Sequence, residues 1–306
     1  MDFPLQDELK DDLKTRIRAL NRPMQAQPTG EKARLSRKLP GIRVVLFDIY
    51  GTMLTAGRGE IGVGQAAAEK TPATDALTAA GFACAGEECG FRAVEILQSE
   101  IRADHEQLRR QGVDYPEVEI RDVWQRTLDI LIRDGHVRGL ITPEAVQRLA
   151  VEYECRVNPA WPMQDLRQTL EALRVKDIVL GIVSNAQFYT PLIMDVFPET
   201  GWTEGWFDAG LCGWSYELRV AKPSLRLVEH VLTLVGTQLG IGPESVLCVG
   251  NDLANDIMPA SRLGCRTALF AGDAKSLRLR AGDTLVEGIK PDSVITELGQ
   301  LTEIIR

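Results

Sequence analysis

Short, nearly continuous apolar runs alternate with longer helical patterns along this chain. The apolar runs occupy residues 42–47, 178–183, 245–249 and 267–270, and runs of this length bounded by polar turns are typical of buried strands. The clearest helical pattern between them spans residues 223–239. Because buried strands that alternate with helices form parallel sheets covered on both faces, we predict an α/β fold with a doubly wound parallel sheet.

The long interval between the first and second predicted strands is mostly helical in pattern. Candidate helices span residues 72–80, 87–112, 119–134, 143–157 and 162–174, with Gly or Pro near most breaks. This block predicts a second, helical domain, inserted as a lid above the carboxyl ends of the strands. The boundaries that we predict are an N-terminal helix and basic linker at 1–41, an α/β core at 42–58 and 165–306, and a helical cap at 59–164.

The first residues predict an amphipathic helix, because Leu5, Leu9, Leu13 and Ile17 recur every four positions. Such a helix either docks on another molecule, as in a dimer, or packs on its own domain. The basic segment that follows it contains Pro and Gly and is typical of a linker.

Composition and charge limit the partners and the cellular location that we expect. The chain has 306 residues and a net charge of −8, which disfavours nucleic acid and anionic membranes as partners and leaves a small-molecule partner open. The N-terminus is acidic, and no run of about 18 apolar residues occurs, so neither a signal peptide nor a membrane anchor is expected. Of the six cysteines only Cys84 and Cys89 lie close together, and we expect a cytoplasmic protein with reduced thiols. A homodimer is possible.

Polar residues follow the predicted strands at the points where the strands end. They are Asp48, Tyr50 and Thr52 after the first strand, Ser184 and Asn185 after the second, and Asn251, Asp252 and Asp256 after a later one. The carboxyl ends of parallel strands meet at one edge of a sheet, so these side chains should share one crevice. Carboxylates packed so closely repel one another, and a cation is needed. Lys222 together with a divalent metal would supply the positive charge.

These residues form four ordered motifs that resemble those of the haloacid dehalogenase (HAD) superfamily, with its Rossmann-like core. The motifs are residues 47–52, Ser184-Asn185, Lys222-Pro223 and Gly250 to Asp256. The resemblance implies that Asp48 is the nucleophile and forms an ester or phosphate that water then cleaves. It also implies that Thr52 and Ser184 hold the oxygens of the transferred group, that Lys222 orients Asp48, and that Asn185 belongs to the catalytic set. The implied Mg²⁺ ligands are Asp48, the Tyr50 backbone carbonyl, Asp252 and Asp256.

Two features of the motifs indicate different reactions. Most phosphatases of the superfamily carry an acid at the position of Tyr50, where it protonates the leaving group, whereas tyrosine is familiar there from 2-haloacid dehalogenases, whose halide needs no proton. By contrast, Asp252 and Asp256 suit Mg²⁺ and an anionic phosphate. Either Asn251 or Asp252 takes the first acidic position of the fourth motif, and the sequence leaves both alternatives open.

We therefore expect a hydrolase that uses Asp48 as covalent nucleophile for the Mg²⁺-assisted hydrolysis of a small phosphorylated metabolite with a good leaving group. The first alternative is metal-independent hydrolysis of a carbon–halogen bond, as in 2-haloacid dehalogenases. The second is an anion-binding module without turnover.

Substrate choice is expected to lie with the cap and with the turn after the first strand. Candidate substrate-binding residues are Tyr50, Arg58, His105, Arg109, Arg110, Tyr115, Arg121 and Trp124. Arg58 lies between two glycines that suit a hinge. The basic stretch at 271–280 is expected to be a solvated loop and short helix.

Overall fold

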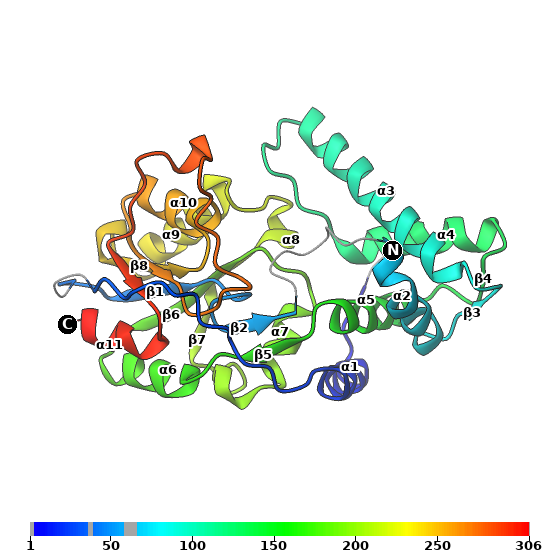
Figure 1. Cartoon of the computed structure of the whole chain (residues 1–306), viewed down its shortest axis with the longest axis horizontal. Helices are drawn as coiled ribbons and strands as arrows, with labels where there is room; N and C mark the ends of the chain where they lie inside the picture. Colours follow the sequence, from blue (N-terminus) through cyan, green and yellow to red (C-terminus); the bar gives the residue numbers. More distant parts are fainter. Residues whose placement is uncertain (1–2, 36–38, 58–65, 306) are drawn as a thin grey trace. The chain divides into compact units, whose positions relative to one another are not determined.

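The chain forms two compact units, which are described one at a time. The computed structural model describes residues 3–35, 39–57 and 66–305, coloured along the sequence in Figure 1. The helical unit comprises Met1–Arg22, Glu60–Pro159 and Gln187–Val196, and the sheet unit comprises Pro23–Gly59, Ala160–Ala186 and Phe197–Arg306. The domain boundaries expected from the sequence stay a prediction.

A parallel sheet of six strands forms the centre of the sheet unit. Its strand order is β10-β9-β8-β1-β6-β7, and every neighbouring pair is parallel. The strands are β1 Val44–Phe47, β6 Val179–Ser184, β7 Phe207–Trp214, β8 Val246–Gly250, β9 Arg266–Phe270 and β10 Ser293–Ile295. The chain thus winds from the central β1 toward both edges, which confirms the predicted doubly wound α/β fold.

Alternating strand residues explain how the sheet is covered. Val44 and Leu46 of β1 join the buried cluster that holds Leu227 and Val231 of α9 (Leu225–Leu239). Figure 1 shows α9 and α10 (Met258–Arg262) on one face of the sheet, and α6 (Leu166–Val175) and α11 (Leu301–Ile304) on the other. Because both faces are covered, the central strands are apolar at nearly every position.

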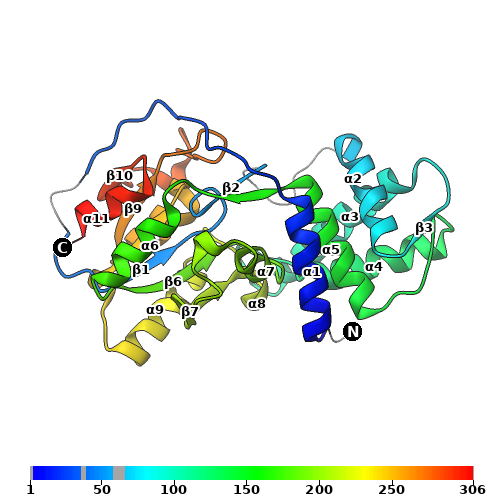
Figure 2. The ribbon, with the colours of Figure 1, turned by 90° about the horizontal axis from the view of Figure 1, so that it is seen from below.

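The basic segment after the first helix is attached to the sheet unit. The Arg34 and Val294 backbones exchange two hydrogen bonds, of 2.8 and 3.0 Å, and the Gln27 N–H donates to Asp273. Figure 2 shows this segment, in blue, passing along the sheet unit toward β10. The segment predicted as a linker therefore also pairs with an edge strand. Within the sheet unit β2 (Leu54–Ala56) also pairs with β5 (Ala160–Pro162).

Six helices build the helical unit in its described residues. They are α1 Asp7–Leu20, α2 Ala66–Ala79, α3 Cys89–Arg110, α4 Ile120–Arg133, α5 Pro143–Val157 and α7 Thr190–Asp195. Leu9, Leu13 and Ile17 of α1 are buried, and α1 packs against α5 and α7 within this unit. The stripe of apolar residues therefore faces the protein's own interior. No helix in the described part of the chain has both the length and the apolar character to cross a bilayer.

Predicted and observed helices differ most at α2. The pattern predicts a helix that begins at Pro72, because proline is favoured in the first turn. The observed helix begins earlier, at Ala66, and contains Pro72 in its interior. The bounds of α5, Pro143–Val157, agree with the prediction, since Thr142 caps its N-terminus by accepting from the Ala145 N–H.

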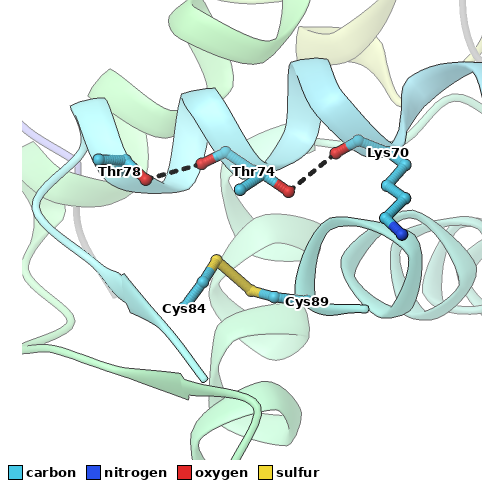
Figure 3. The surroundings of a disulfide bond; sticks show 5 residues. All are labelled: Lys70, Thr74, Thr78, Cys84 and Cys89. Atoms are coloured by element: carbon cyan, nitrogen blue, oxygen red, sulfur yellow. Dashed lines mark hydrogen bonds between the residues drawn. A yellow bond between two sulfur atoms is a disulfide. The ribbon is translucent and has the colours of Figure 1, made fainter. Parts of the chain in front are cut away.

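A disulfide joins Cys84 and Cys89 in the helical unit (Figure 3). Cys84 ends β3 (Ala83–Cys84), which pairs with β4 (Val137–Arg138), and Cys89 begins α3. The bond thus fixes the short connection between a strand and the helix that follows it. The expectation of reduced thiols is wrong for this pair, whereas Cys155, Cys212, Cys248 and Cys265 are free thiols.

Candidate active site

The polar residues of the four motifs meet at the carboxyl edge of the central sheet. Asp48 follows β1, Ser184 ends β6, and Asn251 follows β8. Since β1 lies between β6 and β8 in the sheet, these three residues come from neighbouring strands. The chain reverses direction in strand order at this point, and such switch points are where open α/β sheets bind ligands.

Asp48 is buried, with 8% of its surface exposed, and its two carboxylate oxygens have different surroundings. Oδ1 accepts from the Lys222 ammonium at 2.8 Å and from the Ser184 hydroxyl at 3.1 Å. The Thr52 hydroxyl lies 3.3 Å from Oδ2. Oδ1 is therefore firmly held, while Oδ2 has one long hydrogen bond to a described residue.

Lys222 is a buried ammonium with every proton used. Its Nζ donates to Asp48 Oδ1, to the Val183 carbonyl at 2.9 Å and to Asp256 Oδ1 at 2.6 Å. The Asn185 side chain fixes its backbone, accepting from the Lys222 N–H at 2.8 Å and donating to its carbonyl at 3.1 Å. Burial alone would lower the pKa of Lys222, but the carboxylates of Asp256 and Asp48 outweigh burial and raise it. The lysine therefore carries a permanent positive charge.

Asp256 is the second carboxylate on this ammonium. It lies in a short π-helical turn, Leu253–Ile257, and its Oδ2 accepts from the Asp252 N–H at 2.9 Å. A Cβ at Gly250 would lie 2.2 Å from the Asp256 carboxyl carbon, so only glycine leaves room for this side chain. Burial raises the pKa of Asp256 to about 7, with Asp48 and Asp252 adding to the rise and Lys222 opposing it.

The raised pKa of Asp256 predicts that stability falls as the pH rises. Between its ordinary value of 3.8 and about 7, the folded chain keeps a proton that the unfolded chain has lost. The free energy of unfolding should therefore fall across this window, by up to roughly 1.4 kcal/mol per pH unit. Asp256→Asn should lose less stability over the same range. Chemical unfolding of both proteins at the two ends of the window checks this, and equal losses would contradict it.

Asn251, and not Asp252, lies beside the nucleophile. The Thr52 hydroxyl that faces Asp48 also lies 3.1 Å from Asn251 Oδ1, and Asn251 Nδ2 donates to the Ser276 carbonyl at 2.5 Å. Gly51, at φ +88°, makes this packing possible, because a Cβ there would lie 2.7 Å from Asn251 Nδ2. Tyr50 lies half-buried in the same turn.

The carboxylate of Asp252 is occupied by Arg280. The guanidinium donates from Nε to Oδ1 at 3.1 Å and from Nη2 to Oδ2 at 2.5 Å. Asp252 Oδ1 also accepts from the Ala254 and Asn255 N–H groups, which caps the π-helical turn. Asp252 is thus both a cap and half of an ion pair.

Sequence reasoning missed the segment that supplies Arg280. Asp273 and Ser276 of the stretch 271–280 are buried, with 1% and 2% of their surfaces exposed, whereas Ala274, Lys275 and Leu279 are exposed. The predicted solvated loop is therefore wrong for part of the stretch, and the predicted short helix does not form there. The available signal was its place after β9, because residues that follow a parallel strand reach the same edge of the sheet.

The arrangement of donors does not fit the implied Mg²⁺. Each of the six oxygens of Asp48, Asp252 and Asp256 already has a protein donor within hydrogen-bond distance. Among residues 3–35, 39–57 and 66–305 no group of three or more His, Cys, Asp or Glu side chains could hold a metal ion. Mg²⁺ needs several open oxygen ligands in near-octahedral geometry, and these carboxylates face ammonium, guanidinium, hydroxyl and backbone N–H groups.

The substrate-binding candidates of the helical unit have varied surroundings. Arg121 is held by Glu119 at 2.8 and 2.7 Å, and its guanidinium lies 4.6 Å from the Phe188 ring centre. Trp124 is fully buried, and its ring lies 5.1 Å from that of Tyr153. These contacts indicate structural roles for both. His105 and Tyr115 are half-buried, Arg109 and Arg110 are exposed, and Arg58 lies outside the described residues. Binding of substrate by these residues stays a prediction.

Comparison with known proteins identifies relatives of this chain at the level of family. The family model of the haloacid dehalogenase-like hydrolases matches residues 42–264 of this chain. No curated protein sequence matches significantly.

Several solved structures are similar to this chain. A 2-haloacid dehalogenase from Pseudomonas syringae pv. Tomato DC3000 is 18% identical, with 86% of this chain and 97% of that chain covered and a TM-score of 0.51. A HAD phosphatase from Thermococcus onnurineus is 20% identical, with 86% and 97% covered and a TM-score of 0.47. The putative HAD-hydrolase YfnB from Bacillus subtilis, solved bound to magnesium, is 17% identical, with 87% and 99% covered and a TM-score of 0.47. The similarity to the Pseudomonas syringae enzyme, at 18% identity, shows the fold alone.

Proposed function

The chain belongs to the haloacid dehalogenase-like family of hydrolases, and from this premise we propose that it hydrolyses a small anionic substrate through a covalent ester of Asp48. The observation that supports the proposal is that the two oxygens of the Asp48 carboxylate have different hydrogen-bond partners. Lys222 and Ser184 fix Oδ1, at 2.8 and 3.1 Å, and this leaves Oδ2 as the oxygen with available lone pairs. A carboxylate with one oxygen fixed and the other available is suited to nucleophilic attack.

Four residues of the cluster have roles in the proposed reaction. Asp48 Oδ2 attacks the electrophilic carbon of the substrate, an ester bond forms, and the leaving group departs with the bonding electrons. Lys222 orients Asp48 and stabilises negative charge at Oδ1. The buried hydroxyls of Ser184 and Thr52, which contact Asp48 in the structure, would turn to donate to the oxygens of the bound substrate. Water then attacks the ester carbonyl, which releases the hydroxylated product and a proton and regenerates the carboxylate.

The leaving group that the geometry supports best is halide. Tyr50 takes the position that a general acid would need, and a phenol with an ordinary pKa of about 10 is a poor proton donor at neutral pH. The charge of Asp252, which would repel the carboxylate of a haloacid, is paired with Arg280. Both observations support metal-independent hydrolysis of a carbon–halogen bond in a small anionic substrate.

The second candidate is the Mg²⁺-assisted hydrolysis of a small phosphorylated metabolite with a good leaving group. The observation that favours it is the chemical type of the donors, since Asp48, Asp252 and Asp256 offer the carboxylate oxygens that Mg²⁺ prefers. This function would require Arg280 to leave Asp252. We further propose that the helical segment between the first and second motifs acts as the cap that selects the substrate.

Hydrolysis assays with and without Mg²⁺ separate the two candidates. The purified protein is tested on 2-chloropropionate and on para-nitrophenyl phosphate, each with Mg²⁺ and with EDTA. We expect chloride release that EDTA does not change and that Asp48→Asn abolishes. Phosphate release that requires Mg²⁺, without chloride release, would replace the proposed function by the second candidate. No release from either substrate would favour an anion-binding role at the same site.

A further inference from the structure

The segment after β9 brings a second cation to the active site. We propose that Arg280 is a positioning residue that takes the place of the expected divalent metal, holding Asp252 and preventing it from binding a metal ion. The inference rests on the proposed function in one respect only, that the reaction at Asp48 proceeds without a metal.

The segment is fixed to both motifs that carry the carboxylates. Ser276 Oγ lies 3.3 Å from the Gly51 carbonyl in the turn after β1, and the Ser276 carbonyl accepts from Asn251 at 2.5 Å. Asp273 anchors the beginning of the segment, since its carboxylate accepts from the Thr55 hydroxyl at 2.9 Å. These contacts place the segment against the first and the fourth motif at once.

A backbone bridge then aims Arg280 at its partner. The Leu253 N–H donates to the Arg278 carbonyl at 2.9 Å, and the Arg278 N–H donates to the Asn251 carbonyl at 3.0 Å. Residues 251–253 and 278 are therefore paired on either side of Asp252, and Arg280 follows two positions later. Its backbone has φ +50°, a left-handed conformation that is unfavourable for residues with a Cβ. The surrounding contacts hold this strained conformation, with its guanidinium on Asp252.

Charge explains why a cation is needed there. Asp48, Asp252 and Asp256 are all buried, and Lys222 pairs with the first and the last of them. Asp252 would be a buried carboxylate without a counter-charge if Arg280 were absent, which is the condition that attracts a divalent cation. The Arg280 side chain is 29% exposed, against 4% for Lys222, so it reaches Asp252 from the solvent side. The guanidinium thus satisfies the charge requirement from which we had expected a metal.

Titration with Mn²⁺ tests this inference without any substrate. Calorimetry compares wild type, Arg280→Gln, Arg280→Lys and the double variant Arg280→Gln/Asp252→Asn. Wild type and Arg280→Lys should bind Mn²⁺ at least about tenfold more weakly than Arg280→Gln, because only the last leaves Asp252 Oδ2 without its cationic donor. The double variant should lose the binding gained by Arg280→Gln. Lys275→Gln, which removes an exposed positive charge from the same segment, should bind as wild type does.

The outcomes that overturn the inference are equally specific. Mn²⁺ binding by wild type that is as tight as that of Arg280→Gln would show that the arginine does not keep a metal out. Absence of binding in a folded Arg280→Gln would show that Asp252 has no metal affinity to block. If Arg280→Gln fails to fold, Asp252→Asn/Arg280→Gln should restore folding, and failure to do so would also contradict the ion-pair role. Because the titration contains no substrate, its result is independent of chloride release.

A kinetic measurement distinguishes a positioning role from a merely structural one. In EDTA, kcat for 2-chloropropionate should fall about tenfold in Arg280→Gln and recover in Arg280→Lys, with the thermal midpoint of unfolding compared in parallel. An equal fall of kcat in both variants would contradict the inference that the positive charge at position 280 is what Asp252 requires.

Discussion

Replacement of Asp48 by asparagine should abolish turnover while the fold is preserved. The asparagine would keep the shape of the side chain and could still accept from Lys222, so the buried cluster should stay in place. An amide is a far poorer nucleophile than a carboxylate, and removal of a nucleophile lowers kcat by about 10³-fold or more. Halide release under saturating 2-chloropropionate measures the loss, and circular dichroism with thermal unfolding measures the fold.

Asp177→Asn is the matched control for this variant. Asp177 is exposed and has φ +57°, a conformation that asparagine tolerates well, so the same chemical change there should leave kcat unaltered. Turnover by Asp48→Asn above about 1% of wild type would contradict the assignment of the nucleophile.

Replacement of Lys222 by methionine should have the second largest effect, on activity and on stability together. The ammonium holds Asp48 and Asp256 at 2.8 and 2.6 Å, and its loss leaves two buried carboxylates facing each other. Removal of one partner from a buried ion pair costs about 3–5 kcal/mol. Loss of the charge that orients and stabilises Asp48 should also lower kcat by about 10²- to 10³-fold. Thermal unfolding and steady-state kinetics measure the two effects.

A double variant separates the two effects of Lys222. Lys222→Met/Asp256→Asn removes one of the two carboxylates that lose their partner, so part of the stability should return. The activity should not return, because Asp48 still lacks its ammonium. Lys290→Met, at an exposed lysine, is the control for the substitution itself. Recovery of activity in the double variant would contradict a direct role of Lys222 at Asp48.

Much of the site could be predicted because its residues follow strong strand signals. Asp48, Ser184 and Asn251 each end or follow a strand with a continuous apolar run, and parallel topology brings such ends together. β7 was missed because it is an edge strand with exposed residues in its middle. β10 was missed because three residues, Ser293–Ile295, are too few for a periodic pattern.

The role of Arg280 could not be read from local pattern. Its partner, Asp252, lies 28 positions earlier, and the basic residues around it resemble an ordinary solvated loop. The need for a cation at the carboxylates was predictable from charge repulsion. The chemical identity of that cation depends on the tertiary contact between Arg280 and Asp252. The spacing of residues in the sequence does not predict this contact.

Arg121 shows which contacts a local sequence argument reaches and which it does not. An arginine in a predicted cap helix is a reasonable candidate for binding an anionic substrate. In the structure its guanidinium pairs with Glu119 two residues earlier and stacks on Phe188 from a distant part of the chain. The first contact was within reach of a local argument, whereas the second required the fold.

A single-turnover reaction in H₂¹⁸O tests the covalent role of Asp48 most directly. With enzyme in excess over 2-chloropropionate, water attacks the ester carbonyl of Asp48, so the label should enter the Asp48 carboxylate and the first product should carry unlabelled oxygen. Mass spectrometry of the peptide that contains Asp48, and of the hydroxy acid, measures both. Label in the product, with none in Asp48, would mean that water attacks the substrate directly and would contradict the ester mechanism.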